Sequence, residues 1–186
     1  IYIAGSIGDS ALGLKAIQQK WHLPQAIAAY NLPQPRPDFA AAIAAHAHAA
    51  IDISDGLSSE LMHLAKASGL GLQVYEEKIP VDPAVMTIAE EFNLNGVTCA
   101  LNGGEDYELL FTVAQKDYDK IKANPNMTVI GYMVDKNSGT NLVTHDAKAV
   151  PLSAQGWNSH GTRTVRGRTV IAVGAAKRTA WGLQKG

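Results

Sequence analysis

Short apolar segments alternate with longer stretches of helical periodicity along this chain, and no other feature constrains its fold as strongly. Ile51 and Ile53 point to one face of a predicted strand, with Asp52 and Ser54 on the other face. Leucines then recur four and three residues apart, which predicts a helix over about 55–68 that stops at a glycine. Strands followed by helices in this way are typical of α/β domains.

The same patterns predict further strands at 1–4, 72–76, 107–113, 128–134 and 141–144. Helices are predicted at 9–19, 23–30, 38–48, 83–92 and 115–123. We expect the strands at 128–134 and 141–144 to form a hairpin through the turn KNSG, which adds an antiparallel component. The predicted fold class is therefore α/β, a layered domain with a mixed β-sheet covered by helices.

Composition excludes several classes of protein. Of 186 residues, 46% are hydrophobic and 18% charged, which is the balance of a folded globular chain with one ample domain. The formal net charge of −1 gives no basic field for nucleic acid or an anionic membrane, and no apolar run reaches the roughly 20 residues of a membrane span. The single cysteine, Cys99, fits a reducing compartment, so we predict a cytoplasmic protein with neither nucleic acid nor membrane as partner.

The two ends of the sequence give expectations about how this chain relates to a longer protein and where its main domain ends. The stretch IYIAGS enters a strand at its first residue without an initiator methionine, so we expect a piece of a longer chain. From residue 159 onward there are six Lys or Arg and no acid, so we predict that 159–186 is a basic tail outside the main domain at 1–158. Such a tail is typical of a solvated extension or of sequence introduced by cloning, and a functional arm is the alternative.

The stretch IDISDGLSSEL carries two aspartates and a serine where the predicted strand turns into a helix. Asp and Ser are favoured at helix starts, because their oxygens accept hydrogen bonds from the free N–H groups of the first turn. Capping does not account for Asp52, which lies upstream in the strand. Carboxylates at the carboxyl end of a strand are also oxygen ligands of the kind that magnesium takes. Capping and a metal or phosphate role both stay open from the spacing alone.

Two other stretches are candidate site segments. In NGGEDYELLFT, paired glycines precede three acids, so Glu105 or Asp106 could bind a cationic or hydroxylated ligand, and a solvated turn is the alternative. In GSIGDSALGL, glycines before a helix could present N–H groups to a phosphate, but no dinucleotide or Walker pattern is present, and a tight strand-to-helix connection is favoured. No Ser/His/Asp or HExxH pattern supports covalent or zinc hydrolysis, and the histidines receive no ligand role.

These stretches in this order, together with the RP of PQPRPDF and a closing GWN, resemble the C-terminal half of the thiamine-monophosphate kinase family. The resemblance runs from residue 1 to about 158. SDGL-like stretches also occur in relatives such as aminoimidazole ribonucleotide synthetase and selenophosphate synthetase, whereas GGEDYELLFT looks particular to the thiamine enzyme. The resemblance implies a domain like the C-terminal domain of aminoimidazole ribonucleotide synthetase.

The resemblance also implies the reaction and the roles of five residues. Such kinases transfer the γ-phosphoryl group of ATP directly to thiamine monophosphate, with Mg²⁺ and without a covalent protein intermediate or a protein catalytic residue. Asp52 and Asp55 would be magnesium ligands, and Ser54 would contact ATP. Glu105 and Trp157 would bind thiamine monophosphate, whose cationic thiazolium suits a carboxylate and an aromatic face.

The family also has an N-terminal domain that supplies further magnesium-binding aspartates and much of the ATP site, and that forms a homodimer. We find no counterpart of it in this sequence, so we expect the chain alone to be inactive or nearly so. The alternatives are another ATP-using synthetase of the same superfamily, and a non-catalytic α/β binding module whose acids are caps and turns.

Overall fold

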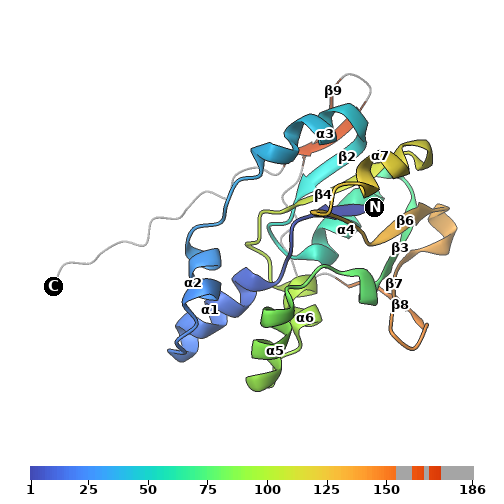
Figure 1. Ribbon diagram of the computed structural model, residues 1–186. Coiled ribbons are helices and arrows are strands. Elements are labelled where there is room, and N and C mark those ends of the chain that lie inside the picture. Colours follow the sequence, from blue (N-terminus) through green and yellow to red (C-terminus); the bar gives the residue numbers. More distant parts are fainter. Residues whose placement is uncertain (154–160, 166–167, 173–186) are drawn as a thin grey trace.

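Two β-sheets covered by helices form the fold, which confirms the predicted α/β layered architecture with two sheets in place of one (Figure 1). The computed structural model describes residues 1–153, 161–165 and 168–172. The six-stranded sheet has the order β5-β1-β4-β2-β10-β9, and the four-stranded sheet has the order β6-β3-β7-β8. The strands are β1 (Tyr2–Ala4), β2 (Ala47–Asp52), β3 (Gly71–Tyr75), β4 (Leu109–Val113), β5 (Met127–Val129), β6 (Gly131–Val134), β7 (Thr140–Val143), β8 (Ala149–Pro151), β9 (Gly161–Val165) and β10 (Arg168–Ala172).

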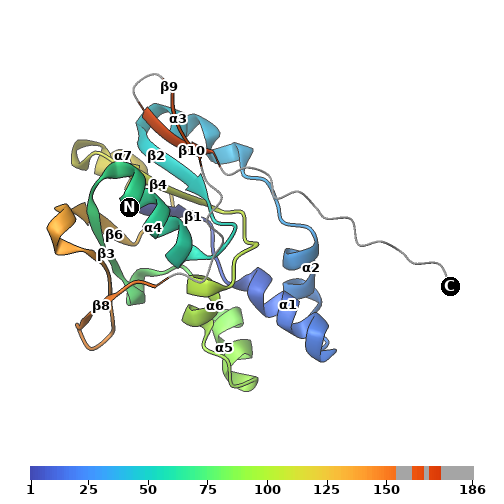
Figure 2. The ribbon, with the colours of Figure 1, turned by 180° about the vertical axis from the view of Figure 1, so that it is seen from behind.

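Helices lie on both faces of the six-stranded sheet and at one end of it (Figures 1 and 2). The α-helices are α1 (Asp9–Gln19), α2 (Pro24–Asn31), α3 (Ala40–His46), α4 (Leu57–Ser68), α5 (Pro83–Glu91), α6 (Gly96–Asn102) and α7 (Tyr118–Lys122). Short 3₁₀ turns are η1 (Pro37–Phe39), η2 (Glu76–Lys78), η3 (Gln115–Asp117) and η4 (Lys136–Ser138).

Alternation along β1 divides the hydrophobic core into two layers. Ile3 belongs to a cluster that also takes in the leucines of α4 and the inner residues of β2 and β3. Tyr2 belongs to a cluster on the opposite face, with contributions from α3 and α7. Because successive side chains of a strand point to opposite faces, the first strand contributes to both cores.

The helices α1, α2 and α5 share a third, smaller cluster at the lower end of the sheet in Figure 1. Leu12 of α1, Ala26 of α2 and Val85 of α5 are its buried members. The sequence predicted these three helices and missed α6, which has only seven residues and includes the β-branched Val97 and Thr98. The Thr98 N–H donates to Asn95 Oδ1 at 2.8 Å, and this side-chain cap is the local sequence signal for the start of α6.

The predicted strand at 128–134 and its hairpin are wrong in two respects. The segment is split at Ile130 into β5 and β6, which belong to different sheets. The strands β6 and β7 do not pair with each other, because β3 lies between them, antiparallel to β6 and parallel to β7. The residue after the split, Gly131, packs its backbone closely against Gln73 and Val74 of β3, where a side chain would clash.

Two boundaries also differ from the sequence prediction. The alanine-rich helix ends at His46, and His48 is already an exposed residue of β2. Within the predicted basic tail, β9 and β10 pair antiparallel, and β10 runs parallel to β2. The domain limits at 158 and 159 remain predictions. No helix in the described ranges is long and apolar enough to cross a membrane.

Candidate functional site

Two loops at the lower end of the six-stranded sheet lie against each other and form the candidate site. The N–H groups of Glu105 and Tyr107 donate to the carbonyls of Ser54 and Ile53, each at 2.8 Å. The N–H of Ile53 donates in return to the carbonyl of Glu108, also at 2.8 Å. The sheet pairing of β2 with β4 thus continues beyond the strand ends and holds the two candidate stretches, IDISDGL and NGGEDYE, side by side.

The backbone of the second loop is held in an uncommon conformation. Glu105 and Tyr107 have φ angles of 61° and 54°, the left-handed region that non-glycine residues rarely adopt. Gly104, with φ of 69°, lies so close to Ser54 that a side chain there would clash with the Ser54 carbonyl. Strain of this kind persists where surrounding structure enforces it, and it is concentrated at functional sites.

The start of α4 overturns the capping interpretation of the first stretch. Its N-cap residue is Gly56, with φ of 109° and ψ of 148°, and no side chain caps the helix. A Cβ at this position would lie 2.8 Å from the Leu101 carbonyl oxygen, so only glycine fits. Asp55 and Ser54 therefore precede the helix without capping it.

Three of the predicted site carboxylates are gathered around one tyrosine. The hydroxyl of Tyr107 donates to Glu105 Oε2 at 3.0 Å. Burial raises the pKa of Tyr107 to about 12, and the hydrogen bond and the negative charges of Glu105, Asp52 and Asp55 act in the same direction. The charge of each carboxylate thus reaches the phenol, which places the two loops' acids in one electronegative region that favours a cation.

Ser54, the predicted ATP contact, is partly exposed and lies beside a buried acid. Its Oγ donates to Glu60 Oε1 at 3.5 Å, and the N–H of Asp55 donates to the same oxygen at 3.1 Å. Glu60 itself has no exposed surface. Burial raises the pKa of Glu60 to about 7 and the charge of Asp55 acts in the same direction, although the hydrogen bonds from the loop oppose both.

Asp106 lies in the same loop but is turned toward α1. Its carboxylate accepts hydrogen bonds from the Gly8 N–H at 3.0 and 3.1 Å, and from the Ser10 N–H at 3.3 Å. Residues 6–8 are thus a tight strand-to-helix connection, as favoured from sequence. Because an internal carboxylate occupies these N–H groups, they do not offer a phosphate site, and Glu105 is the loop acid that faces solvent.

Replacing Asp106 with Asn is expected to flatten the dependence of stability on pH. Burial raises the pKa of Asp106 to about 7, and the charge of Asp9 adds to this, so the folded state holds a proton that the unfolded chain loses near pH 4. This stability contribution is present in full below pH 4 and is lost as pH rises through 7. Urea unfolding measures how much the free energy of unfolding falls between pH 4.5 and pH 7.5. This fall should be smaller in D106N than in the parent chain by roughly 2 kcal/mol. The exposed change Asp119→Asn serves as control, and equal slopes in D106N and the parent chain would contradict the assignment.

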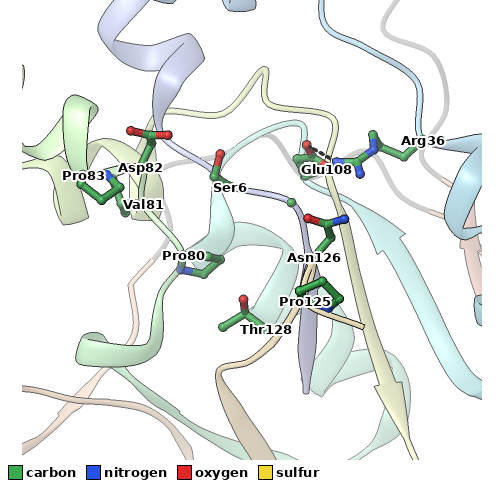
Figure 3. A pocket seen from close by; sticks show the side chains of 11 residues that line it. Ser6, Arg36, Pro80, Val81, Asp82, Pro83, Glu108, Pro125, Asn126 and Thr128 are labelled. Atoms are coloured by element: carbon green, nitrogen blue, oxygen red, sulfur yellow. Dashed lines mark hydrogen bonds and ion pairs between the residues drawn. The ribbon is translucent and has the colours of Figure 1, made fainter. Parts of the chain in front are cut away.

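A separate cavity of about 440 Å³ has Glu108, the residue after Tyr107, among its lining residues (Figure 3). Arg36 also lines this cavity, and its Nη1 donates to both carboxylate oxygens of Glu108, at 3.0 and 3.1 Å. The neighbours Tyr107 and Glu108 therefore face different surroundings, the first toward the site acids and the second toward this ion pair. Of the predicted site residues that the structure describes, none lines the cavity, whose other lining residues are Gly5, Ser6, Pro80, Val81, Asp82, Pro83, Pro125, Asn126 and Thr128.

The donor set suits a magnesium ion that arrives with phosphates. Among the described residues, no three His, Cys, Asp or Glu side chains are grouped to hold a metal ion by themselves. Mg²⁺ in nucleotide sites is commonly held by one or two carboxylates, with water and substrate phosphates completing the octahedron. Asp52 and Asp55, both partly exposed and both near Tyr107, fit that requirement. Trp157 lies outside the described residues.

The comparisons with known proteins give the class to which this fold and site belong. Residues 1–143 match the family described as AIR synthase related protein, C-terminal domain, and the chain belongs to that family. Its curated relatives include thiamine-monophosphate kinases of Buchnera aphidicola subsp. Schizaphis graminum, 36% identical over 170 residues, and of Salmonella typhimurium, 35% identical over 173 residues. These matches cover 85% and 87% of this chain, and the chain spans about half the length of each relative, 51% and 52%.

Solved structures give the same result. The structure of AaThiL complexed with AMPPCP and TMP superposes with a TM-score of 0.68 at 32% identity, covering 80% of this chain and 48% of that one. A hydrogenase maturation protein of Escherichia coli, at 18% identity, superposes with a TM-score of 0.66 over 82% of this chain and 48% of that one, and shares the fold alone. These findings confirm the resemblance to the thiamine-monophosphate kinases.

Sequence reasoning missed Tyr107 and Glu60 as parts of the site. Tyr107 was counted only as the start of a strand, although an aromatic residue between two acids after a glycine pair is the signal for it. Glu60 belonged to the polar residues of a helix that was expected to begin at 55. In the structure its side chain is fully buried and accepts a hydrogen bond from the Asp55 N–H.

Proposed function

We propose that this chain is the C-terminal, substrate-side half, residues 1–158, of an ATP-dependent kinase that phosphorylates thiamine monophosphate to thiamine diphosphate. The single observation that supports it most is the gathering of Asp52, Asp55 and Glu105 around Tyr107. The family resemblance implies ligand roles for these acids, and the chain is similar to thiamine-monophosphate kinases along about half of their length.

In this proposal the two loops have different ligands. Asp52 and Asp55 would hold Mg²⁺ on the ATP phosphates, and Ser54 would contact the nucleotide. When bound, Mg²⁺ neutralises charge on the phosphates, which lets two polyanionic reactants approach. Glu105 would attract the thiazolium cation, with Trp157 lining the same pocket. Tyr107 donates to Glu105 and so fixes the direction of its carboxylate.

The remaining parts of the site are proposed to come from an N-terminal domain that precedes this chain in the complete protein. That domain would add magnesium-binding aspartates and the contacts of a homodimer, and the isolated chain would then have little or no kinase activity. Efficient turnover of thiamine monophosphate by this chain alone would contradict this division of the site.

Replacing Glu105 with Gln in the complete protein is expected to weaken thiamine monophosphate binding at least about tenfold, since the amide removes the charge that faces the cation. The measurement is calorimetric titration of thiamine monophosphate in the presence of Mg²⁺ and AMPPCP. Glu90→Gln, an exposed change on α5, is the matched control. Unchanged affinity in E105Q would remove Glu105 from the substrate site.

A panel of candidate substrates, offered to the same complete protein, tests which substrate it phosphorylates. Thiamine monophosphate, formylglycinamidine ribonucleotide and selenide are offered with ATP, and ADP or AMP release is followed. Turnover with either of the last two, and not with the first, would favour another synthetase of the superfamily. Absence of any ATP-dependent turnover in the complete protein would favour a binding module.

A further inference from the structure

Glu60 is a carboxylate with no exposed surface, although it lies in the first turn of α4 beside a partly exposed loop. Its Oε1 accepts hydrogen bonds from the Asp55 N–H and the Ser54 hydroxyl. Its Oε2 is buried and has no hydrogen-bond partner among the described residues. A buried carboxylate with half of its acceptor capacity unused is costly, because such groups lose the hydration that they have in the unfolded chain.

Support for the helix does not account for this cost. Helix starts are ordinarily stabilised by a Ser, Thr, Asp or Asn side chain at the N-cap, and α4 has Gly56 there with no side-chain cap. Glu60 reaches past Gly56 to the two residues before it. The hydrogen bonds that it accepts from Ser54 and Asp55 therefore hold the loop that precedes the helix.

The hydrogen bonds to Glu60 hold a part of the loop that no other backbone contact described above holds. The carbonyls of Ile53 and Ser54 are already held by the Tyr107 and Glu105 N–H groups of the facing loop. That ladder holds the backbone as far as Ser54. The N–H of Asp55, one residue beyond it, is held by Glu60 at 3.1 Å. Glu60 thus extends the rigid frame to the second of the two acids that would hold the metal.

We propose that Glu60 is a positioning residue, which holds the Ser54 hydroxyl and the Asp55 N–H and thereby sets the direction of the Asp55 carboxylate for Mg²⁺ on the nucleotide. This inference rests on the proposed function and adds to it a residue with no contact to substrate. In this proposal, the geometry of the loop depends on the buried acid, and the stability of the helix does not.

The first test uses this chain with Mn²⁺ and AMPPCP together as the probe, because substrate phosphates complete the metal's ligand shell. In ¹H–¹⁵N NMR spectra, Mn²⁺ should broaden the amide signals of residues 52–55, and the Asp55 amide should exchange slowly with solvent. Glu60→Ala is expected to speed exchange at Asp55 and to raise the Mn²⁺ concentration for half-broadening at least tenfold. Glu60→Gln keeps a side-chain carbonyl at the same reach, so its half-broadening concentration should stay within threefold of the parent chain.

Leu61→Ala is the control for stability, because it lies next to Glu60 on α4, is fully buried and makes no bond to the loop. It should lower stability without moving the Mn²⁺ concentration. If E60A changes stability as L61A does and leaves the Mn²⁺ response unchanged, Glu60 is a structural residue and the proposal is overturned. Absence of broadening at 52–55 in the parent chain overturns it as well.

A second test in the complete protein separates this proposal from the proposed function. E60A should raise the Mg²⁺ concentration for half-maximal turnover at least tenfold, with thiamine monophosphate affinity within twofold. Failure of the kinase assay with the unaltered protein, beside intact Mn²⁺ broadening, would contradict the kinase and leave the positioning role standing. An active kinase whose Mg²⁺ requirement is the same in E60A would contradict the positioning role alone.

Discussion

Replacing Asp52 or Asp55 with Asn in the complete protein is expected to lower kcat for thiamine monophosphate phosphorylation roughly 10²–10³-fold, which corresponds to about 3–4 kcal/mol of barrier. The amide has the shape of the carboxylate but neither its charge nor its second acceptor oxygen, so it is a poor ligand for Mg²⁺. The fold should be unaffected, because both side chains are partly exposed. Steady-state kinetics over a series of Mg²⁺ concentrations measure the effect.

Each variant also has a readout without substrate. The negative charges of Asp52 and Asp55 both raise the pKa of Tyr107, so removing either charge should move that pKa down from about 12. Ultraviolet titration of the phenols follows this change. Asp119→Asn, an exposed change on α7, should alter neither kcat nor the Tyr107 titration. A kcat within threefold of the parent enzyme in both D52N and D55N would exclude the two acids from the metal site.

The second large effect is expected in the core, where Leu61→Ala should destabilise the chain by about 2–5 kcal/mol. Leu61 is 0% exposed and belongs to the core cluster that α4 shares with β1, β2 and β3, where truncation leaves a cavity that rigid strands cannot close. Its neighbour Met62 is 39% exposed on the same helix, so Met62→Ala should change stability by less than about 1 kcal/mol. Urea unfolding of both variants measures the difference. Equal losses in L61A and M62A would mean that α4 does not pack as described.

The sequence was sufficient to predict the elements whose own periodicity is strong. The leucines of α4 and the paired isoleucines of β2 predicted a helix after a strand, and both are present. The helix α6 was missed because seven residues give too little periodicity. The split at Ile130 was missed because β5 and β6 are both apolar, and only their partners, β1 and β3, assign them to different sheets.

The candidate site was predictable in its residue types and less so in its geometry. Acids in two separate stretches were predicted to bind ligands, and hydrogen bonds between those loops bring Asp55 near Glu105. Sequence could not separate the roles of Glu105 and Asp106, which are adjacent. A left-handed turn at Glu105 and the burial of Asp106 against α1 decide which of them faces solvent. Such a distinction depends on contacts between segments far apart in the chain.

The strand β1 has a consequence for the order in which the protein can assemble. Tyr2 pairs with Phe111 on one side and with Val129 on the other, so both partners of this strand are synthesised long after it. During translation, its apolar residues have no sheet to join until β4 and β5 have emerged from the ribosome. Pairing between such distant segments makes folding slow, and it leaves the hydrophobic β1 segment as a natural target for chaperones in the interval.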